Sequence, residues 1–317
     1  MKYYCPIIIK DAKFKKFTLS KDVILRLTKK QLREFFGIEE IQYTFIRIMS
    51  WVALSKIKPA KVNGRCPYSG IVKKGIYDGA HDVLASNYVA HVASDKDYHR
   101  VFERVNLSFK LCIPTSTGIS LFFREKEIDV GLFNQMFTLN GPFDYLSINK
   151  KDLFQIKYIF SLFAKRKKDK KLNLITSLYR RALLGDKSLL DVRFLLLTAT
   201  LESLYLPLQN QELSYRLQFR MSKLLSGYMR KDPFELSKII KKIYKVRSKI
   251  IHTGESNELE KDSSLFIELV NLVRVSIILY IYDKNLFSDD YLDRICLLGH
   301  SRRIIKPKTL DLLLNRF

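Results

Sequence analysis

The second half of the chain is a series of helical apolar patterns that few glycines or prolines interrupt. From about residue 150, apolar residues recur at spacings of three and four, which places them on one face of an α-helix. Gly227, Pro233 and Gly254 lie where helix starts and stops are expected. We therefore predict an all-helical domain over residues 151–317. Its helices are expected at 151–166, 172–185, 188–206, 211–227, 233–252, about 259–283 and about 288–315.

Residues 1–150 show a mixed pattern, which predicts an α+β domain. The apolar spacing favours helices at 20–36 and at 79–94. Residues 101–113 and 119–123 flank a short turn and favour two strands. The expected fold class is therefore an N-terminal α+β domain followed by an all-α bundle, with the boundary between residues 150 and 151.

The chain carries 56 Lys and Arg against 32 Asp and Glu, a formal net charge of +24 over 317 residues. Hydrophobic residues make up 47% of it, which argues against a disordered chain. A charge excess of this size points to a polyanionic partner, most often nucleic acid. The alternative is a chain that simply places its lysines on solvated faces. The charge alone leaves these two interpretations open.

Several features of the sequence bear on its compartment. The four cysteines are scattered and form no CxxC pair, which favours a reducing environment over a disulfide scaffold. The N-terminus lacks the apolar core of a signal peptide. The longest apolar stretch, 265–282, contains Glu268 and Arg274, so we expect a buried core helix and not a membrane span. The prediction is a cytoplasmic protein without membrane contact.

Residues 238–252 form the helix that carries the candidate chemistry. Wound at 100° per residue, this helix presents three faces of different character. They are an apolar stripe (Ile239, Ile240, Ile243, Val246, Ile250, Ile251), a basic face (Lys241, Lys242, Lys245, Lys249) and a column between them (Tyr244, Ser248, His252).

Arg247 falls inside the apolar stripe of this helix. A guanidinium there cannot lose its charge, so it needs either a partner or a substrate anion. Glu202 is a second charged residue on an otherwise apolar helix, and the opposite signs suggest a pair. Such a pair is either a structural salt bridge between two helices or the support of a substrate-binding arginine. The residues themselves leave both possibilities open.

His252 lies at the end of the same helix, just before Thr253 and Gly254, which suit a helix cap. The negative end of the helix dipole favours the imidazolium, which suits a group that exchanges protons near neutral pH. Arginine, histidine and lysines on one helix suit phosphodiester cleavage without a metal. A base takes the proton of the ribose 2′-OH, an acid protonates the leaving 5′ oxygen, and a cation stabilises the pentacoordinate phosphate. We expect no metal and no cofactor, and a symmetric dimer that supplies the second histidine.

The run from Arg247 to His252, Arg-Ser-Lys-Ile-Ile-His, fits the R-x4-6-H signature of HEPN domains. Residues 197–206, 212–225 and 240–254 resemble the Apea-like HEPN subgroup in sequence. There the pattern is a Leu-Glu-x-Leu helix, a Tyr-Arg…Arg helix and a closing Tyr-x-x-Arg-Ser-x-Ile-x-His-Gly. The resemblance covers about 190–282. The chain departs from it at Thr253, which separates His252 from Gly254, and it lacks the tyrosine of the R-x4-H-x-Y toxin class.

The resemblance implies an all-helical domain that forms a homodimer through the helix at 233–252. It also implies a metal-independent endoribonuclease that leaves cyclic phosphate ends and acts as a toxin or effector in abortive-infection defence against phage. Residues 1–150 are then expected to recognise substrate, a regulatory protein or a phage trigger. The residue roles that follow are catalytic for Arg247 and His252, supporting for Glu202, Tyr244 and Ser248, and RNA-binding for Lys241, Lys245 and Lys249.

Two other functions remain open from the sequence. In a non-catalytic nucleic-acid-binding or scaffold protein, Arg247 and Glu202 are a structural pair. A DNA-binding regulator would bind duplex DNA with a steep salt dependence. No helix-turn-helix pattern is clear enough to favour the regulator.

Overall fold

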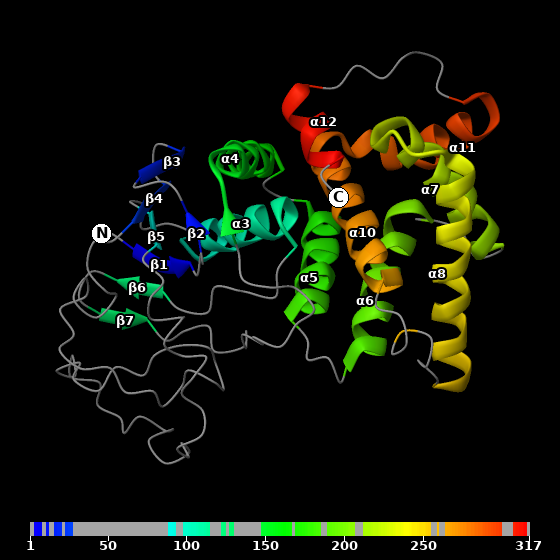
Figure 1. The fold of residues 1–317 in the computed structure, drawn as a ribbon, viewed down its shortest axis with the longest axis horizontal. Coiled ribbons are helices and arrows are strands. Elements are labelled where there is room, and N and C mark those ends of the chain that lie inside the picture. The colour runs from blue at the N-terminus through cyan, green and yellow to red at the C-terminus, as the bar shows by residue number, and fades with distance from the viewer. Residues whose placement is uncertain are drawn as a thin grey trace. The chain divides into compact units, whose positions relative to one another are not determined.

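The computed structural model describes fifteen segments of the chain, and its two compact units cover residues 1–161 and 162–317. The part described is mostly helical (Figure 1). Along the sequence, the division between the units falls within helix α4 (Lys150–Ala164), whereas the predicted boundary lies at the start of that helix. The segments are 3–7, 11–12, 16–20, 23–27, 88–92, 98–114, 122–124, 127–129, 147–166, 169–184, 189–206, 212–254, 259, 264–299 and 307–315.

A six-stranded antiparallel sheet lies in the first unit, with the strand order β3-β4-β5-β1-β6-β7. A separate parallel pair joins β2 to β8. The strands are β1 (Tyr3–Ile7), β2 (Asp11–Ala12), β3 (Lys16–Ser20), β4 (Val23–Leu27), β5 (Tyr88–Val92), β6 (Phe122–Arg124), β7 (Glu127–Asp129) and β8 (Ser147–Ile148).

Two of these strands occupy segments for which the sequence favoured helices. Strand β4 lies within 20–36 and strand β5 within 79–94, and the two strands pair with each other. For these residues the helix predictions are wrong. A segment of five residues with four apolar members fits either period, and pairing with a neighbouring strand then decides the structure. The remaining residues of both predictions lie outside the described part of the chain.

Helix α3 (Tyr98–Cys112) corrects the prediction of a strand at 101–113. Leu107, Phe109 and Leu111 alternate as they would in a strand. However, every residue from 105 to 112 is buried, including Lys110. The polar residues between these three are buried as well, so the alternation does not mark one exposed and one buried face as it would in a strand. The second predicted strand, 119–123, is described only at Phe122 and Phe123, which belong to β6.

Residues 28–87 and 130–146 lie outside the described residues, so the predicted class of the region 1–150 as a whole stays a prediction. Within the described part, α3 and α4 are joined by a hydrogen bond. The Cys112 thiol donates to Oε1 of Gln155 at 3.5 Å. The ring of Phe154 on α4 also packs edge-on against Phe17 of β3, with 5.7 Å between centroids.

The described residues of the second unit form helices, as the sequence predicts. Helix α7 runs past the predicted stop at Gly227 and ends at Met229, with Arg230 in the left-handed region (φ 54°). The predicted helix at 288–315 is two helices, because Gly299 ends the first and Pro307 caps the second. The helices are α5 (Lys170–Leu184), α6 (Leu190–Tyr205), α7 (Leu213–Met229), α8 (Pro233–Thr253), α10 (Ser264–Tyr282), α11 (Asp289–Leu298) and α12 (Lys308–Leu314), with a 3-10 turn η2 (Lys284–Phe287).

Helix α10 is the centre of this unit. Every residue from Leu269 to Ile281 is buried, and the helix packs against α5, α6, α8 and η2. It is long and apolar enough to cross a membrane by length and composition, but 83% of that stretch is buried against the rest of the structure. The prediction of a buried core helix at 265–282 is therefore confirmed.

Candidate functional site

Local sequence signals fix both ends of helix α8. The Asp232 side chain accepts hydrogen bonds from the backbone N–H groups of Phe234 (2.8 Å) and Glu235 (3.0 Å), and Pro233 occupies the first helical position. At the other end, Gly254 adopts the left-handed conformation (φ 69°) and donates its N–H to Ile250 O at 3.0 Å. The helix thus places His252 in its last turn, as the sequence predicts.

The buried face of α8 follows the predicted apolar stripe, with two exceptions at its edges. Ile239 is half-buried and Ile251 is 48% exposed. The side chain of Arg247 is 24% exposed, so it lies at the margin of the packed face and not within it. The fully buried members of the face are Leu236, Ile240, Ile243, Val246 and Ile250.

Arg247 pairs with Glu202, which confirms the predicted ion pair between α8 and α6. The Arg247 Nε lies 3.2 Å from Glu202 Oε1, and Nη2 donates a hydrogen bond to Oε2 at 3.5 Å. Oε1 itself is buried and receives no hydrogen bond within the described structure. The pair is therefore close enough for a strong charge interaction but is incompletely hydrogen-bonded.

The environment of this pair makes the acid harder to ionise than a free glutamate. Burial raises the pKa of Glu202 above its ordinary value, and the charge and hydrogen bond of Arg247 lower it by less. Tyr244, one turn before Arg247, places its ring 5.5 Å from the Arg247 guanidinium carbon. Two of the predicted supporting residues, Glu202 and Tyr244, thus contact the arginine directly.

His252 is exposed and makes no hydrogen bond or ion pair within the segments that the structure describes. It lies five residues beyond Arg247, which on an α-helix is about 7.5 Å along the axis and about 140° around it. The two side chains therefore leave different sides of α8. Ser248 is half-buried and lies between them in sequence. One chain brings Arg247, Tyr244 and Glu202 together, but it does not bring His252 to them.

The predicted RNA-binding lysines lie on the outer side of α8. Lys241 and Lys245 are exposed, as is their neighbour Lys242, while Lys249 is half-buried. No carboxylate in the described part of the chain pairs with Lys241, Lys242 or Lys245. These three charges are therefore available to an anionic ligand.

Three other arginines are more deeply buried than Arg247, and the sequence analysis did not single them out as sites. Arg193, Arg220 and Arg274 are at most 2% exposed. Arg193 donates from Nε to Ala182 O at 2.6 Å, and Arg274 donates from Nη2 to Leu313 O at 3.1 Å. Each follows the same pattern of a cation among apolar neighbours that drew attention to Arg247. Burial of an arginine in this protein is therefore no mark of a catalytic site.

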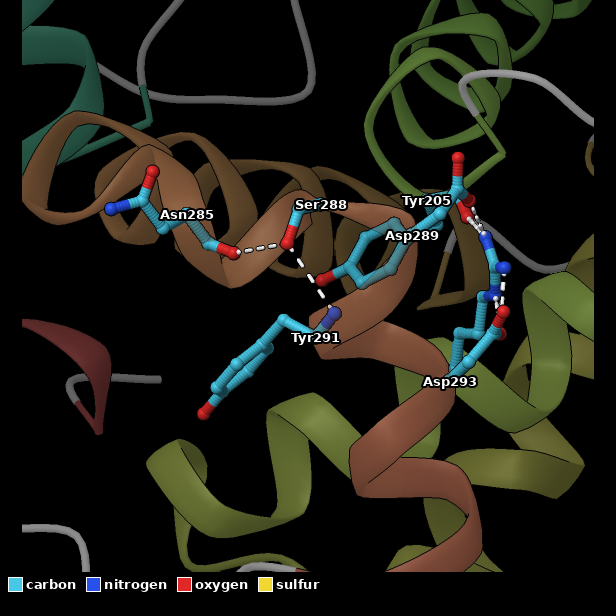
Figure 2. A network of polar contacts seen from close by, with 7 residues as sticks. Tyr205, Asn285, Ser288, Asp289, Tyr291 and Asp293 are labelled. Carbon is cyan, nitrogen blue, oxygen red and sulfur yellow. Dashed lines mark hydrogen bonds and ion pairs between the residues drawn. The ribbon is translucent and has the colours of Figure 1, made fainter.

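Arg220 is the centre of a polar cluster that joins α6, α7 and α11. It donates to Asp289 Oδ1 at 2.6 Å, to Asp293 Oδ1 at 2.7 Å and to the backbone oxygen of Tyr205 at 2.8 Å. Figure 2 shows Tyr205, Asp289 and Asp293 gathered beside the start of α11. Two carboxylates already neutralise this guanidinium, so the cluster holds helices together and is not arranged to bind an anion.

Among the residues that the structure describes, no group of three or more His, Cys, Asp or Glu is arranged to hold a metal ion. Comparison with known proteins gives no assignment: no family model matches the chain, and neither a curated protein nor a solved structure matches it.

Proposed function

We propose that this protein is a metal-independent endoribonuclease of HEPN type, with its helical unit as the HEPN bundle and a composite active site at a homodimer interface through α8. Arg247 holds the scissile phosphate, oriented by Glu202, and His252 transfers protons. An RNA-cleaving toxin or effector of anti-phage abortive infection is the biological role that fits this activity.

One observation carries the proposal. An exposed histidine lies about one and a half turns beyond an arginine that a glutamate positions, beside lysines that no carboxylate of the described segments neutralises. The contacts to Glu202 use Nε and Nη2 of Arg247. Its Nη1 has no acidic partner in the described structure and is suited to a phosphate oxygen. Because Arg247 and His252 leave different sides of one helix, the proposal needs a second chain to complete the site.

The chemistry follows from these groups. The 2′-OH attacks the neighbouring phosphate after losing its proton to one histidine. The 5′ oxygen leaves with a proton from the other, and the products are a 2′,3′-cyclic phosphate and a 5′-hydroxyl end. The Arg247 charge stabilises the pentacoordinate phosphate.

The first test is cleavage of total RNA by the purified protein in EDTA. We expect His252→Ala to reduce the rate about 10²- to 10⁴-fold, since it removes a general acid or base. The free energy of unfolding should stay unchanged, because His252 is exposed and makes no bond that the structure describes. Arg247→Ala should reduce the cleavage rate by a comparable factor. Arg294 is an exposed arginine on α11, so Arg294→Ala serves as the matched control. Equal cleavage by wild type and His252→Ala would overturn the proposal.

A second candidate function is favoured by the pair itself. Because Arg247 already has a carboxylate partner that links α6 to α8, the pair also fits a non-catalytic nucleic-acid-binding or scaffold protein. If the protein has this second function, Arg247→Ala lowers the melting temperature and abolishes no catalytic activity. The variant His252→Ala distinguishes the two functions, because only the nuclease requires His252 for its activity.

A further inference from the structure

An exposed aromatic stack lies on α7, outside the catalytic residues proposed above. The rings of Tyr215 and Phe219 lie almost parallel, with 5.9 Å between centroids and 13° between planes. Tyr215 is 63% exposed. Lys223 follows one turn later and places its Nζ 5.7 Å from the centre of the Phe219 ring. The three residues form a ladder at spacings of four along one helix face.

The Tyr215 ring is the exposed end of this stack. Phe219 covers one side of it, and no other ring in the described residues packs against it. Its hydroxyl makes no hydrogen bond that the structure describes. The exposed Tyr215 ring adds little to the stability of α7, because most of the apolar surface of the ring stays in water. The ring is thus free to stack with a planar ligand group.

The register of the α7–α8 hairpin places basic residues of α8 at the level of the stack. Gln218 Nε2 donates to Ser237 Oγ at 2.5 Å, which fixes how the antiparallel helices meet. Tyr215 lies one turn from this bond toward the start of α7, and Lys241 lies one turn from it toward the end of α8. In an antiparallel pair these two directions are the same. Tyr215 and Lys241 therefore lie at the same level of the hairpin. Lys245 follows one turn further on.

The α7–α8 hairpin carries more basic than acidic residues. Between residues 212 and 254 the hairpin holds eleven basic and three acidic residues. Of the acids, Asp232 caps α8 and Glu235 pairs with Lys238 at 3.0 Å. Glu212, one turn before Tyr215, is the remaining carboxylate. The basic residues are Arg216, Arg220, Lys223, Arg230, Lys231, Lys238, Lys241, Lys242, Lys245, Arg247 and Lys249. Of these, Arg220, Arg230, Lys231 and Arg247 pair with carboxylates of other elements.

We infer that this surface binds single-stranded RNA, with one unpaired base stacked on Tyr215 and the adjoining phosphates on Lys241 and Lys245. Aromatic rings beside regularly spaced cations match the alternation of bases and phosphates in a single strand. Duplex RNA offers the same phosphates, but its bases are already stacked. The inference rests on the proposed ribonuclease function and names its substrate as RNA with unpaired nucleotides.

The test measures binding in a His252→Ala background, so that no RNA is cut. A short unstructured RNA carrying 2-aminopurine reports base stacking through loss of its fluorescence, and anisotropy of a labelled copy reports affinity. We expect Tyr215→Ala to weaken binding about five- to 150-fold, from about 1–3 kcal/mol per stacked base. It should also restore the 2-aminopurine fluorescence. Tyr215→Phe keeps the ring and should retain both signals.

Two controls isolate the stack. Phe234 on α8 is 68% exposed and lies 4.8 Å from Lys238 Nζ, so Phe234→Ala removes an equally exposed ring that has no stacked partner among the described rings. It should leave affinity unchanged. Duplex RNA of the same sequence should bind Tyr215→Ala and its parent equally.

The outcomes separate this inference from the function on which it rests. If the His252→Ala protein binds no RNA, both the nuclease proposal and the stacking site are overturned. If it binds and Tyr215→Ala binds equally well, with the fluorescence still quenched, the stacking site alone is wrong. An equal loss with Phe234→Ala would also overturn the assignment of the base to α7.

Discussion

Arg247 and Glu202 share one partly buried junction between two helices, and the charge of each depends on the other. Their separation of 3.2 Å favours the ionised pair, whereas burial of the carboxylate opposes it. Because burial has the larger effect on Glu202, the junction is a place where pH changes stability. The sign of that change distinguishes this pair from an ordinary surface salt bridge.

The pH dependence can be predicted for Glu202. Its pKa in the folded state is raised above the value of about 4.5 expected in the unfolded chain. The folded protein therefore binds the proton first as pH falls, and its free energy of unfolding rises between the raised pKa and about 4.5. Relative to Glu202→Gln, wild type should gain stability across this window, as measured by urea unfolding at a series of pH values. A loss of relative stability across the same window would show that Arg247 dominates instead.

The sequence located this pair because two charged residues of opposite sign broke two apolar patterns. It could not rank Arg247 against Arg193, Arg220 and Arg274, since burial depends on which helices pack together. The same pattern of apolar neighbours surrounds all four arginines. Which of them keeps a partly exposed guanidinium is decided by tertiary packing.

At the scale of elements, the helices from α4 to α10 lie close to where the periodicity placed them, whereas the last predicted helix is divided at Gly299 and Pro307. Long apolar patterns with caps at Asp232 and Gly254 determine α8 almost completely. The errors fall on short or enclosed elements. Strands β4 and β5 are five residues each, too short to show a period. In α3 the polar residues of 105–112 are buried together with the apolar ones, so the polar pattern does not report exposure.

The Arg220 cluster connects three helices, α6, α7 and α11, through a single guanidinium. We expect Arg220→Met to lower the free energy of unfolding by about 3 kcal/mol, because it leaves Asp289 and Asp293 without their shared cation. Arg294→Met, on the exposed side of α11, should change it by less than about 0.5 kcal/mol. Urea unfolding measures both variants. If the two variants unfold at the same urea concentration, the cluster does not stabilise the junction of α6, α7 and α11.

At the scale of the whole molecule, the net charge of +24 is not all available to a ligand. Arg193, Arg220 and Arg274 are buried, and Arg220 is neutralised by two carboxylates. The exposed lysines of α8 are among the charges that can contact phosphate. The net charge counted from the sequence therefore overestimates the electrostatic field that the protein presents to an RNA.

The salt dependence of RNA binding measures how many of these charges meet phosphates. For single strands, the slope of log affinity against log salt is about −0.7 per neutralised phosphate. The double variant Lys241→Gln/Lys245→Gln should therefore reduce the slope by about 1.4. Lys284→Gln/Lys308→Gln removes two exposed lysines from η2 and α12 and should leave the slope unchanged. An equal change of the slope in both double variants would mean that Lys241 and Lys245 contribute no more to RNA binding than other exposed lysines.

The position of α10 at the centre of its unit has a consequence for synthesis on the ribosome. Helices α5, α6 and α8 pack against α10 but precede it in the chain, so they emerge before the helix that they surround. Until residues 264–282 leave the ribosome, these helices have no central surface on which to bury their apolar faces. This half of the protein therefore completes its core late in translation, and a chain interrupted before α10 exposes the apolar surfaces that chaperones and proteases recognise.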